Sequence, residues 1–186
     1  MTIRRLLNVG TLVLCLVALI VINAVTRDDA PGERWYRGAM GQWVTSPQFD
    51  VRVDARELAR EVSAGSTTRQ TPGVFVVVHW SAAAKGETAY LSKVYLLTGG
   101  GLQVAQRAEF LYLAGISATD AGFTSHGASV FEIQPDQLSD LRLRVDHNRG
   151  VFYTYSGGVE VQLPADQQTP IVELAALPAP QTEVTR

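Results

Sequence analysis

Histidine, cysteine and acidic side chains are the residues of this sequence that could bind a metal ion or move protons. The histidines are His79, His126 and His147, and the single cysteine is Cys15. A structural zinc site needs Cys and His in pairs at short spacing, and these four residues form no such pair. The aspartates between positions 136 and 146 also lack the spacing of a calcium-binding loop. We therefore expect no metal and no other cofactor.

The run TSHGA at residues 124–128 comes closest to a catalytic motif. It resembles the Ser-His-Gly-Cys signature of L,D-transpeptidases, which are envelope enzymes with a cysteine nucleophile. Ala128 stands where that nucleophile belongs, and Cys15 lies in an apolar run, so no acyl-enzyme could form. Neighbouring residues of a strand point to opposite faces, so a Ser125–His126 dyad would require a loop. We interpret this run as a loop and expect no catalytic residues.

The other two histidines have ordinary explanations. His79 lies within a β-rich run, which is typical of a packed, hydrogen-bonded histidine in a core. His147 lies in a polar turn, where a solvated ring is expected.

The charge balance argues against a nucleic-acid partner. The chain has 186 residues, with 16 Lys and Arg against 18 Asp and Glu and a formal net charge of −2. Nucleic-acid binding needs a concentrated basic surface that neutralises phosphates. The sequence contains no such cluster. The part after residue 26 also lacks cysteine, so we expect no disulfide bond there.

Leu6–Val25 is an uncharged and mostly apolar run. A helix of this length covers the roughly 30 Å hydrocarbon core of a bilayer, which predicts a single transmembrane helix in contact with membrane lipid. A cleaved secretory signal has a shorter apolar core. A lipoprotein signal has small residues before its cysteine, whereas Val13 and Leu14 precede Cys15. We therefore expect an uncleaved anchor.

The residues flanking this run predict its orientation. Arg4 and Arg5 favour a cytoplasmic N-terminus, so residues 1–5 would form a short cytoplasmic tail. A long domain that follows the helix is translocated largely regardless of its charge. We expect a single-pass protein of the cell membrane, with residues 27–186 on the extracytoplasmic side.

Residues 26–42 are polar, contain Gly and Pro, and follow no period, which indicates a juxtamembrane stalk. Three large aromatic residues interrupt this pattern: Trp35, Tyr36 and Trp43. They could pack on the edge of the following domain, lie at the lipid interface or bind a partner. Packing is the simplest interpretation, and the same three residues are our candidates for partner contact.

The next part of the chain shows the patterns of β-strands. Phe49, Val51 and Val53 alternate with charged residues, and Val74–Trp80 is apolar on both faces, as in a central strand. Residues 54–62 fit either a strand or a helix with a capping box. Residues 63–73 read as a loop.

Further short strands follow at regular intervals. They are Thr88–Thr98, Leu102–Ala105, Glu109–Leu113, Ser129–Ile133 and Leu141–Val145, with a triple-glycine turn at 99–101. A turn at residues 135–138 would let Leu138 enter the core. Val151–Ser156 and Val159–Leu163 read as a hairpin across two glycines. In the second hairpin strand, Val159, Val161 and Leu163 would point inward and Glu160 and Gln162 outward.

These patterns predict an all-β fold. Eight or nine short strands without a long helix after the anchor are typical of an antiparallel β-sandwich, which we place at residues 43–163. Residues 164–186 contain four prolines and no sustained period, so we expect a flexible tail, with at most one helical turn at Ile171–Leu177.

The order of these segments resembles a known group of proteins. Gly73–Trp80 provides a Phe-Val-Val-Val-type central strand. Ser129–Val145 provides a Phe-x-Ile-x-Pro-Asp-x-Leu segment followed by a Leu-x-Leu-x-Val strand. The chain is similar here to immunoglobulin-like extracellular domains of Gram-positive lipoproteins and anchored proteins, which are largely of unknown function. The resemblance implies an immunoglobulin-like sandwich with an accessory or interaction role, and it implies no catalytic residues.

The sequence leads to one function hypothesis and two alternatives. The first is a non-enzymatic extracytoplasmic module, anchored in the membrane, that assists a membrane or cell-envelope protein complex in transport or secretion. The second is a binding protein for a small ligand or cell-wall polymer, and the third is an envelope hydrolase or transferase. The sequence leaves the partner and the oligomeric state open.

Overall fold

The computed structural model describes residues 34–91, 93–146, 157–164 and 169–185. The predicted anchor Leu6–Val25, the histidine at 147 and the expected strand Val151–Ser156 lie outside these residues. Within the described ranges, no helix is long and apolar enough to cross a membrane. All described strands belong to one unit, Glu33–Arg186.

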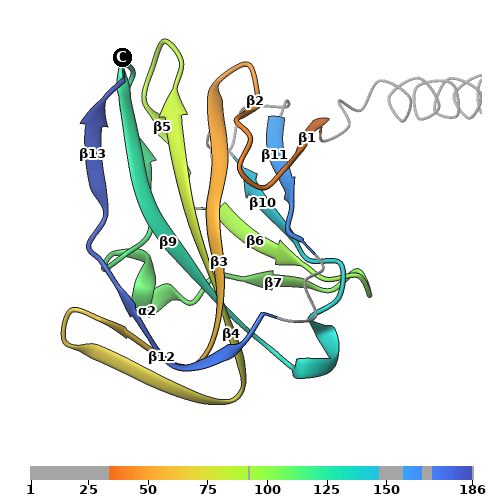
Figure 1. Cartoon of the computed structure of the whole chain (residues 1–186). Coiled ribbons are helices and arrows are strands. Elements are labelled where there is room, and N and C mark those ends of the chain that lie inside the picture. Colours follow the sequence, from red (N-terminus) through yellow and green to blue (C-terminus); the bar gives the residue numbers. More distant parts are fainter. Residues whose placement is uncertain (1–33, 92, 147–156, 165–168, 186) are drawn as a thin grey trace, which may run out of the picture. The chain divides into compact units, whose positions relative to one another are not determined.

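Two sheets form the body of this unit (Figure 1). The first, sheet A, has the order β1 (Arg34–Ala39), β11 (Gly157–Gln162), β10 (Arg142–Asp146), β6 (Lys93–Leu97) and β7 (Gln103–Ala105). The second, sheet B, has the order β12 (Ile171–Leu177), β3 (Phe49–Ala64), β4 (Thr67–Ala84), β9 (Phe123–Ile133) and β13 (Gln181–Val184), with β2 (Val44–Thr45) also paired to β3. A small third sheet joins β5 (Ala89–Tyr90) to β8 (Ala118–Thr119). The all-β sandwich that the sequence predicts is therefore confirmed.

The first core lies between sheets A and B. Its members recur at every second position along their strands, as period two requires. The predicted inward residues of β3 and β11 are fully buried here: Phe49, Val51, Val53, Val159 and Val161. Sheet B contributes further Val76, Val78, Trp80 and Phe131, and sheet A contributes Leu96, Leu143 and Val145. Leu138 packs against this core from the turn η1 (Pro135–Gln137), as predicted.

A second core lies on the opposite face of sheet B. Phe75 and Val77 alternate along β4 with the residues of the first core, so both faces of this central strand are buried, as predicted. Phe110 covers this face from the short helix α2 (Ala108–Leu111). Ala175 and Leu177 of β12 complete the cluster. The prediction of a strand at Glu109–Leu113 is therefore wrong. Residues 108–111 form a helix instead, and this helix packs Phe110 against sheet B.

The strands β3 and β4 are much longer than the sequence indicated. The predicted loop at 63–73 is a two-residue turn at Gly65–Ser66, where Gly65 has a φ of 57°, followed directly by β4. Residues 54–62, for which the sequence allowed either a strand or a helix, belong to the strand β3. The polar residues that read as loop pair across the hairpin, with Ser63 opposite Thr68 and Val62 opposite Arg69. Thr68 and Arg69 are exposed, which explains why they lack an apolar alternation.

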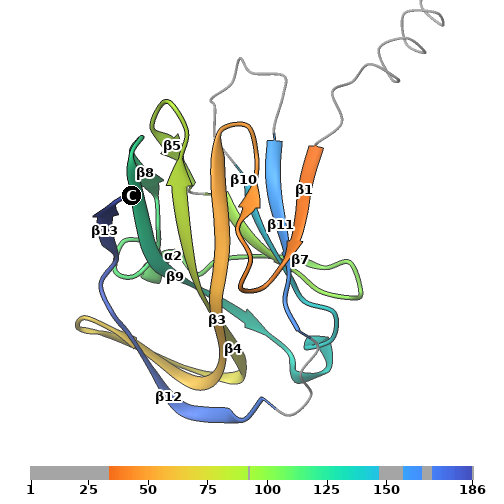
Figure 2. The ribbon, with the colours of Figure 1, turned by 45° about the horizontal axis from the view of Figure 1, so that its top comes forward.

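Both ends of the unit join the sheets, contrary to the prediction. The stalk at 26–42 contributes β1, which pairs in parallel with β11 and lies beside it in Figure 2. The tail at 164–186 contributes β12, which pairs in parallel with β3, and β13, which pairs with β9. Instead of a helical turn, Ile171–Leu177 is a strand because Ala175 and Leu177 bury their side chains in the second core. The boundaries 43–163 are thus too narrow.

Candidate functional site

The three aromatic candidates do not form one surface. Trp35 lies on the outer side of sheet A, against Gly158, with the Arg144 guanidinium 4.6 Å from its ring centroid. Tyr36, its neighbour in β1, points the other way and packs on the first core. Trp43 is 42% exposed and stacks with Arg52 of β3 at 4.9 Å. Trp35 and Tyr36 therefore pack on the domain itself, and Trp43 is the exposed member.

A row of polar side chains begins at this stacked pair and crosses sheet B on the face that carries the second core. We call it the sheet-B row, and it consists of Arg52, Asp54, Ser81, His126 and Glu183. The Arg52 Nε donates to Asp54 Oδ1 at 2.5 Å, and the Ser81 hydroxyl donates to Asp54 Oδ2 at 2.5 Å. His126 Nδ1 lies 2.8 Å from Ser81 Oγ, and His126 Nε2 lies 3.2 Å from Glu183 Oε1. The row thus links β3, β4, β9 and β13.

The hydroxyl of Ser81 has only one proton, which fixes the hydrogen bonds of this row. Because that proton goes to Asp54, Ser81 Oγ accepts from Nδ1–H of His126. The other ring nitrogen, Nε2, faces Glu183, so the imidazole ring connects Ser81 of β4 to a carboxylate of β13. The row therefore works as a bridge between β9 and the terminal strand β13.

The Ser125–His126 pair does not form a dyad. Both residues lie in β9 rather than in the predicted loop, so their side chains point to opposite faces. Ser125 Oγ donates to Thr119 Oγ1 at 3.0 Å and is buried, whereas His126 belongs to the sheet-B row. Ser81 contacts His126 instead, but Ser81 is 0% exposed and donates its proton to a carboxylate. Neither serine combines an accessible hydroxyl with a neighbouring base.

His79 lies on the same face, two residues before Ser81 in β4. Its Nε2 is 3.0 Å from Glu57 Oε1 of β3, and its side chain is 23% exposed. The predicted hydrogen-bonded histidine is therefore found, although it lies at the surface of the sheet rather than in a core. Within the part of the chain that the structure describes, no group of three or more His, Cys, Asp or Glu side chains is placed to hold a metal ion.

The outer side of sheet A contains a buried carboxylate that the sequence did not reveal. Glu160 points outward as predicted, yet its side chain is only 3% exposed because Arg37, Arg142 and Arg144 close over it at 3.2, 3.4 and 2.7 Å. Burial is the largest single influence and raises the pKa of Glu160. The hydrogen bond from Arg144 and the charges of the three arginines outweigh it, so the pKa lies below its ordinary value.

An open groove of about 370 Å³ lies where β7, the segment before α2 and the end of β9 meet. Its lining combines the apolar residues Val104, Ala105 and Ile133 with the polar residues Arg107, Glu132, Gln134 and Gln137. Arg107 donates to Glu109 at 2.6 Å and to Glu132 at 2.8 Å. The hydrogen bond to Arg107 lowers the pKa of Glu109, and the same bond raises the pKa of Arg107.

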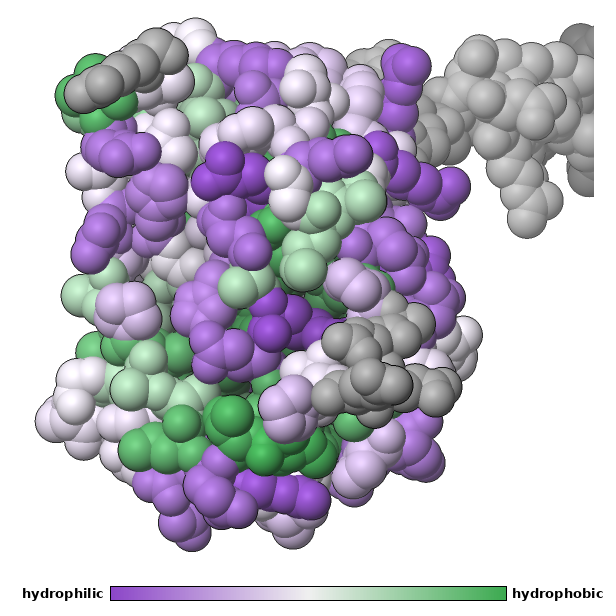
Figure 3. All heavy atoms as spheres, in the orientation of Figure 1, coloured by the Kyte–Doolittle hydropathy of each residue, from purple (hydrophilic) through white to green (hydrophobic). Residues whose placement is uncertain are grey.

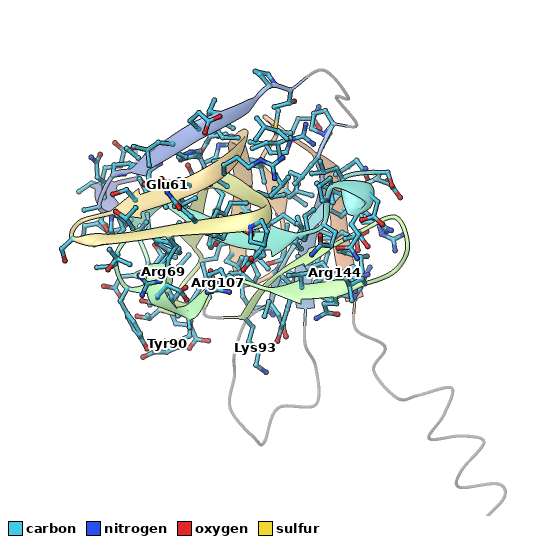
Figure 4. All side chains as sticks on the ribbon, turned by 90° about the horizontal axis from the view of Figure 1, so that it is seen from below. Glu61, Arg69, Tyr90, Lys93, Arg107 and Arg144 are labelled. Atoms are coloured by element: carbon cyan, nitrogen blue, oxygen red, sulfur yellow. The ribbon has the colours of Figure 1, made fainter. Side chains whose placement is uncertain are left out.

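A second arginine supports this group from the β3–β4 hairpin. Arg69 lies 3.9 Å from Glu109, so two arginines flank one carboxylate. Arg69 and Arg107 are labelled in Figure 4. Thr71 donates to the remaining oxygen of Glu132 at 2.5 Å. The charged wall of the groove is therefore held in place before any ligand arrives.

Sequence reasoning missed the sheet-B row, the cover over Glu160 and the groove for one shared reason. Each brings together residues from strands far apart in the chain, such as Asp54 with Ser81 and Arg37 with Glu160. The pairing register of the sheets creates these contacts, and no local spacing encodes it. The sequence singles out Trp43 as a large aromatic residue near the polar stalk, but it does not predict the stacking of Trp43 with Arg52.

Comparison with known proteins gives likeness of fold. No family model matches the chain. No curated protein matches it either.

Three solved structures resemble this one. The yjhA protein of Bacillus subtilis has a TM-score of 0.52 and 11% identity, and the match covers 68% of this chain and 99% of that one. An uncharacterised β-sandwich protein of Clostridium difficile has a TM-score of 0.45 and 11% identity, covering 70% and 95%. The ycdA protein of B. subtilis, a candidate lipoprotein, has a TM-score of 0.46 and 10% identity, covering 68% and 40%. What this chain has in common with such proteins is an all-β sandwich fold.

Proposed function

We propose that this chain is a non-enzymatic interaction module, anchored in a membrane by Leu6–Val25, whose extracytoplasmic domain assists a membrane or cell-envelope protein complex. The apolar run supports the anchor.

We further propose that the sandwich is immunoglobulin-like. The order β3-β4-β9 facing β11-β10-β6-β7 corresponds to the A-B-E and G-F-C-C′ strands of that architecture. The chain passes between the sheets from β4 to β6 and again from β9 to β10, as a Greek key requires. Domains of this architecture often present loops and edges to partners, although the fold alone assigns no function.

The observation that supports partner contact is the stacked pair of Trp43 and Arg52. Tryptophan and arginine dominate the binding energy of protein interfaces. Trp43 remains 42% exposed although Arg52 lies over its ring, and Asp54 fixes the orientation of Arg52. A partner would therefore meet an aromatic face that is already ordered, which lowers the entropy lost on binding. The predicted contact through Trp35 and Tyr36 is less favoured because both pack on the domain.

Affinity purification of the full-length chain from its native membrane in mild detergent tests this proposal. We expect a stoichiometric membrane or envelope protein to accompany the wild type. Trp43→Ala should weaken capture by about 2 kcal/mol, or about 30-fold in Kd. Tyr112→Ala is the matched control, since Tyr112 is 83% exposed and lies elsewhere, after α2. Equal capture by the Trp43 variant would refute the contact.

A second candidate function rests on the groove beside Arg107. Its volume of about 370 Å³ falls in the range of small-molecule sites, and its lining combines apolar residues with fixed polar groups. Recovery of the chain without any protein partner would contradict the first function and favour this one. Saturable binding of an envelope extract, weakened by Arg107→Gln, would then support a ligand or wall-polymer role.

A further inference from the structure

The strand β12 exposes an apolar edge that nothing in the described residues covers. Its one strand neighbour among them is β3. Ile171, Val172 and Leu174 are 39%, 38% and 52% exposed, although the strand buries Ala175 and Leu177. Figure 3 shows a band of apolar side chains across the lower part of this face, where Figure 1 places β12. An open, apolar sheet edge is a template for pairing with another strand.

The sequence of this segment is self-complementary in size and charge. It reads Pro-Ile-Val-Glu-Leu-Ala-Ala-Leu-Pro from Pro170 to Pro178, with Leu174 at its centre. If the segment runs antiparallel to a copy of itself about Leu174, each proline faces a proline. Isoleucine then faces leucine, valine faces alanine, and Glu173 faces the copy's alanine at 175.

We propose that two copies of this chain associate through β12, antiparallel and in register about Leu174, so that the two B sheets join into one. A symmetric dimer requires a surface patch that complements itself, and this strand meets that requirement. The inference is independent of the partner contact at Trp43.

The charges, side-chain sizes and prolines of β12 are all compatible with this pairing. Glu173 is the single charged residue of β12, and in this register it meets Ala175 rather than another carboxylate. Larger side chains face smaller ones at the two flanking positions, so the rows can interdigitate. The prolines lack an N–H group and lie just outside the strand, where the new ladder would end. Any shift of register by two residues would place a proline within the ladder.

Disulfide trapping tests the register directly. In the full-length chain with Cys15→Ser, the variant Leu174→Cys places two cysteines opposite each other. Directly opposite residues have Cα atoms about 4.5–5.5 Å apart, within the range that a disulfide bridges. We expect covalent dimers under mild oxidation in detergent. Val184→Cys, on the 69% exposed residue of β13, is the control and should remain monomeric.

A mixed pair distinguishes this register from others. Val172→Cys and Ala176→Cys, both on exposed residues that face each other in this register, should cross-link to each other more than either does to itself when mixed as two separately tagged chains. Equal cross-linking of all combinations would overturn the register.

Sedimentation of the uncross-linked chain tests the association itself. Wild type should have about twice the protein mass of one 20.2 kDa chain in density-matched detergent, and Leu174→Lys should reduce it to one. Circular dichroism checks that the lysine variant is folded. A monomeric wild type, or a folded lysine variant that stays dimeric, would overturn the proposal. Trp43→Ala should leave the dimer unchanged, so failure here is distinct from failure of the partner contact.

Discussion

A single carboxylate on the outside of sheet A shows how much a side chain depends on its neighbours. Glu160 occupies an outward position of β11, yet it is buried because the long side chains of Arg37, Arg142 and Arg144 fold across it. Trp35 in turn lies against Gly158 and stacks with Arg144. Residues from three strands therefore share one compact ionic and aromatic cluster.

Glu160 should make the stability of the domain sensitive to acid. Its pKa is lower in the native state than in the unfolded chain, where it is about 4.3. The stabilisation is therefore complete above that unfolded value. It is lost as the pH falls toward the native pKa, because the unfolded chain then takes up a proton first. We expect Glu160→Gln to lower the free energy of unfolding by about 2 kcal/mol at neutral pH.

Denaturant titrations of both proteins across the acid range provide the measurement. The difference between wild type and Glu160→Gln should shrink as the pH falls, since the wild type loses its advantage. Asp136→Asn, on an exposed residue of the turn η1, is the control and should follow the wild type. A difference that stays constant with pH would contradict this explanation.

At the scale of elements, the strand β12 is the clearest departure from expectation. It has prolines on both sides and exposes most of its residues, so its sequence looks like a linker. The segment nevertheless forms a strand, because Ala175 and Leu177 are buried in the second core and the backbone pairs with β3. Tertiary pairing thus outweighs a weak local pattern.

Leu177→Ala should therefore destabilise the domain. Leu177 is 7% exposed, and removing its buried methyl groups should lower the free energy of unfolding by about 2–3 kcal/mol. Val184→Ala, on a residue that is 69% exposed, should change it by less than about 0.5 kcal/mol. Chemical denaturation followed by circular dichroism measures both. Equal, negligible effects would mean that this segment is the flexible tail that the sequence predicts.

The elements that could be predicted from sequence are those with strong internal patterns. The alternation at Phe49–Val53 and Val159–Val161, and the apolar run at Val74–Trp80, identify strands that the structure contains. The strands β1, β12 and β13, the polar half of the β3–β4 hairpin and the cover α2 have no such pattern. Their conformation depends on distant partners, which also explains why the sheet-B row and the groove could not be foreseen.

At the scale of the whole unit, two cores share one sheet. Strands β4 and β9 place Val76 and Phe131 in the first core and Phe75 and Val130 in the second. Because the same backbone supports both faces, losing one core should loosen the other. We expect the unit to unfold in one step.

Matched phenylalanine substitutions test this coupling. Phe131→Ala in the first core and Phe110→Ala in the second should each lower the free energy of unfolding by about 3–5 kcal/mol, since both residues are almost fully buried. Each variant should show a single transition, coincident for circular dichroism and for tryptophan fluorescence. A separate early transition in the Phe110 variant would show that the second core is independent.

The parallel strands at the two ends of the unit have a consequence for how the chain is made. Residue 34 pairs with residue 157, and residue 58 pairs with residue 171. These pairings close very long loops, which slows folding. During synthesis β1 cannot pair until β11 has been made, which requires most of the chain. Until then β3 and β4 present an unfinished sheet, so a nascent chain of this protein must be kept from premature association until its last strands have emerged.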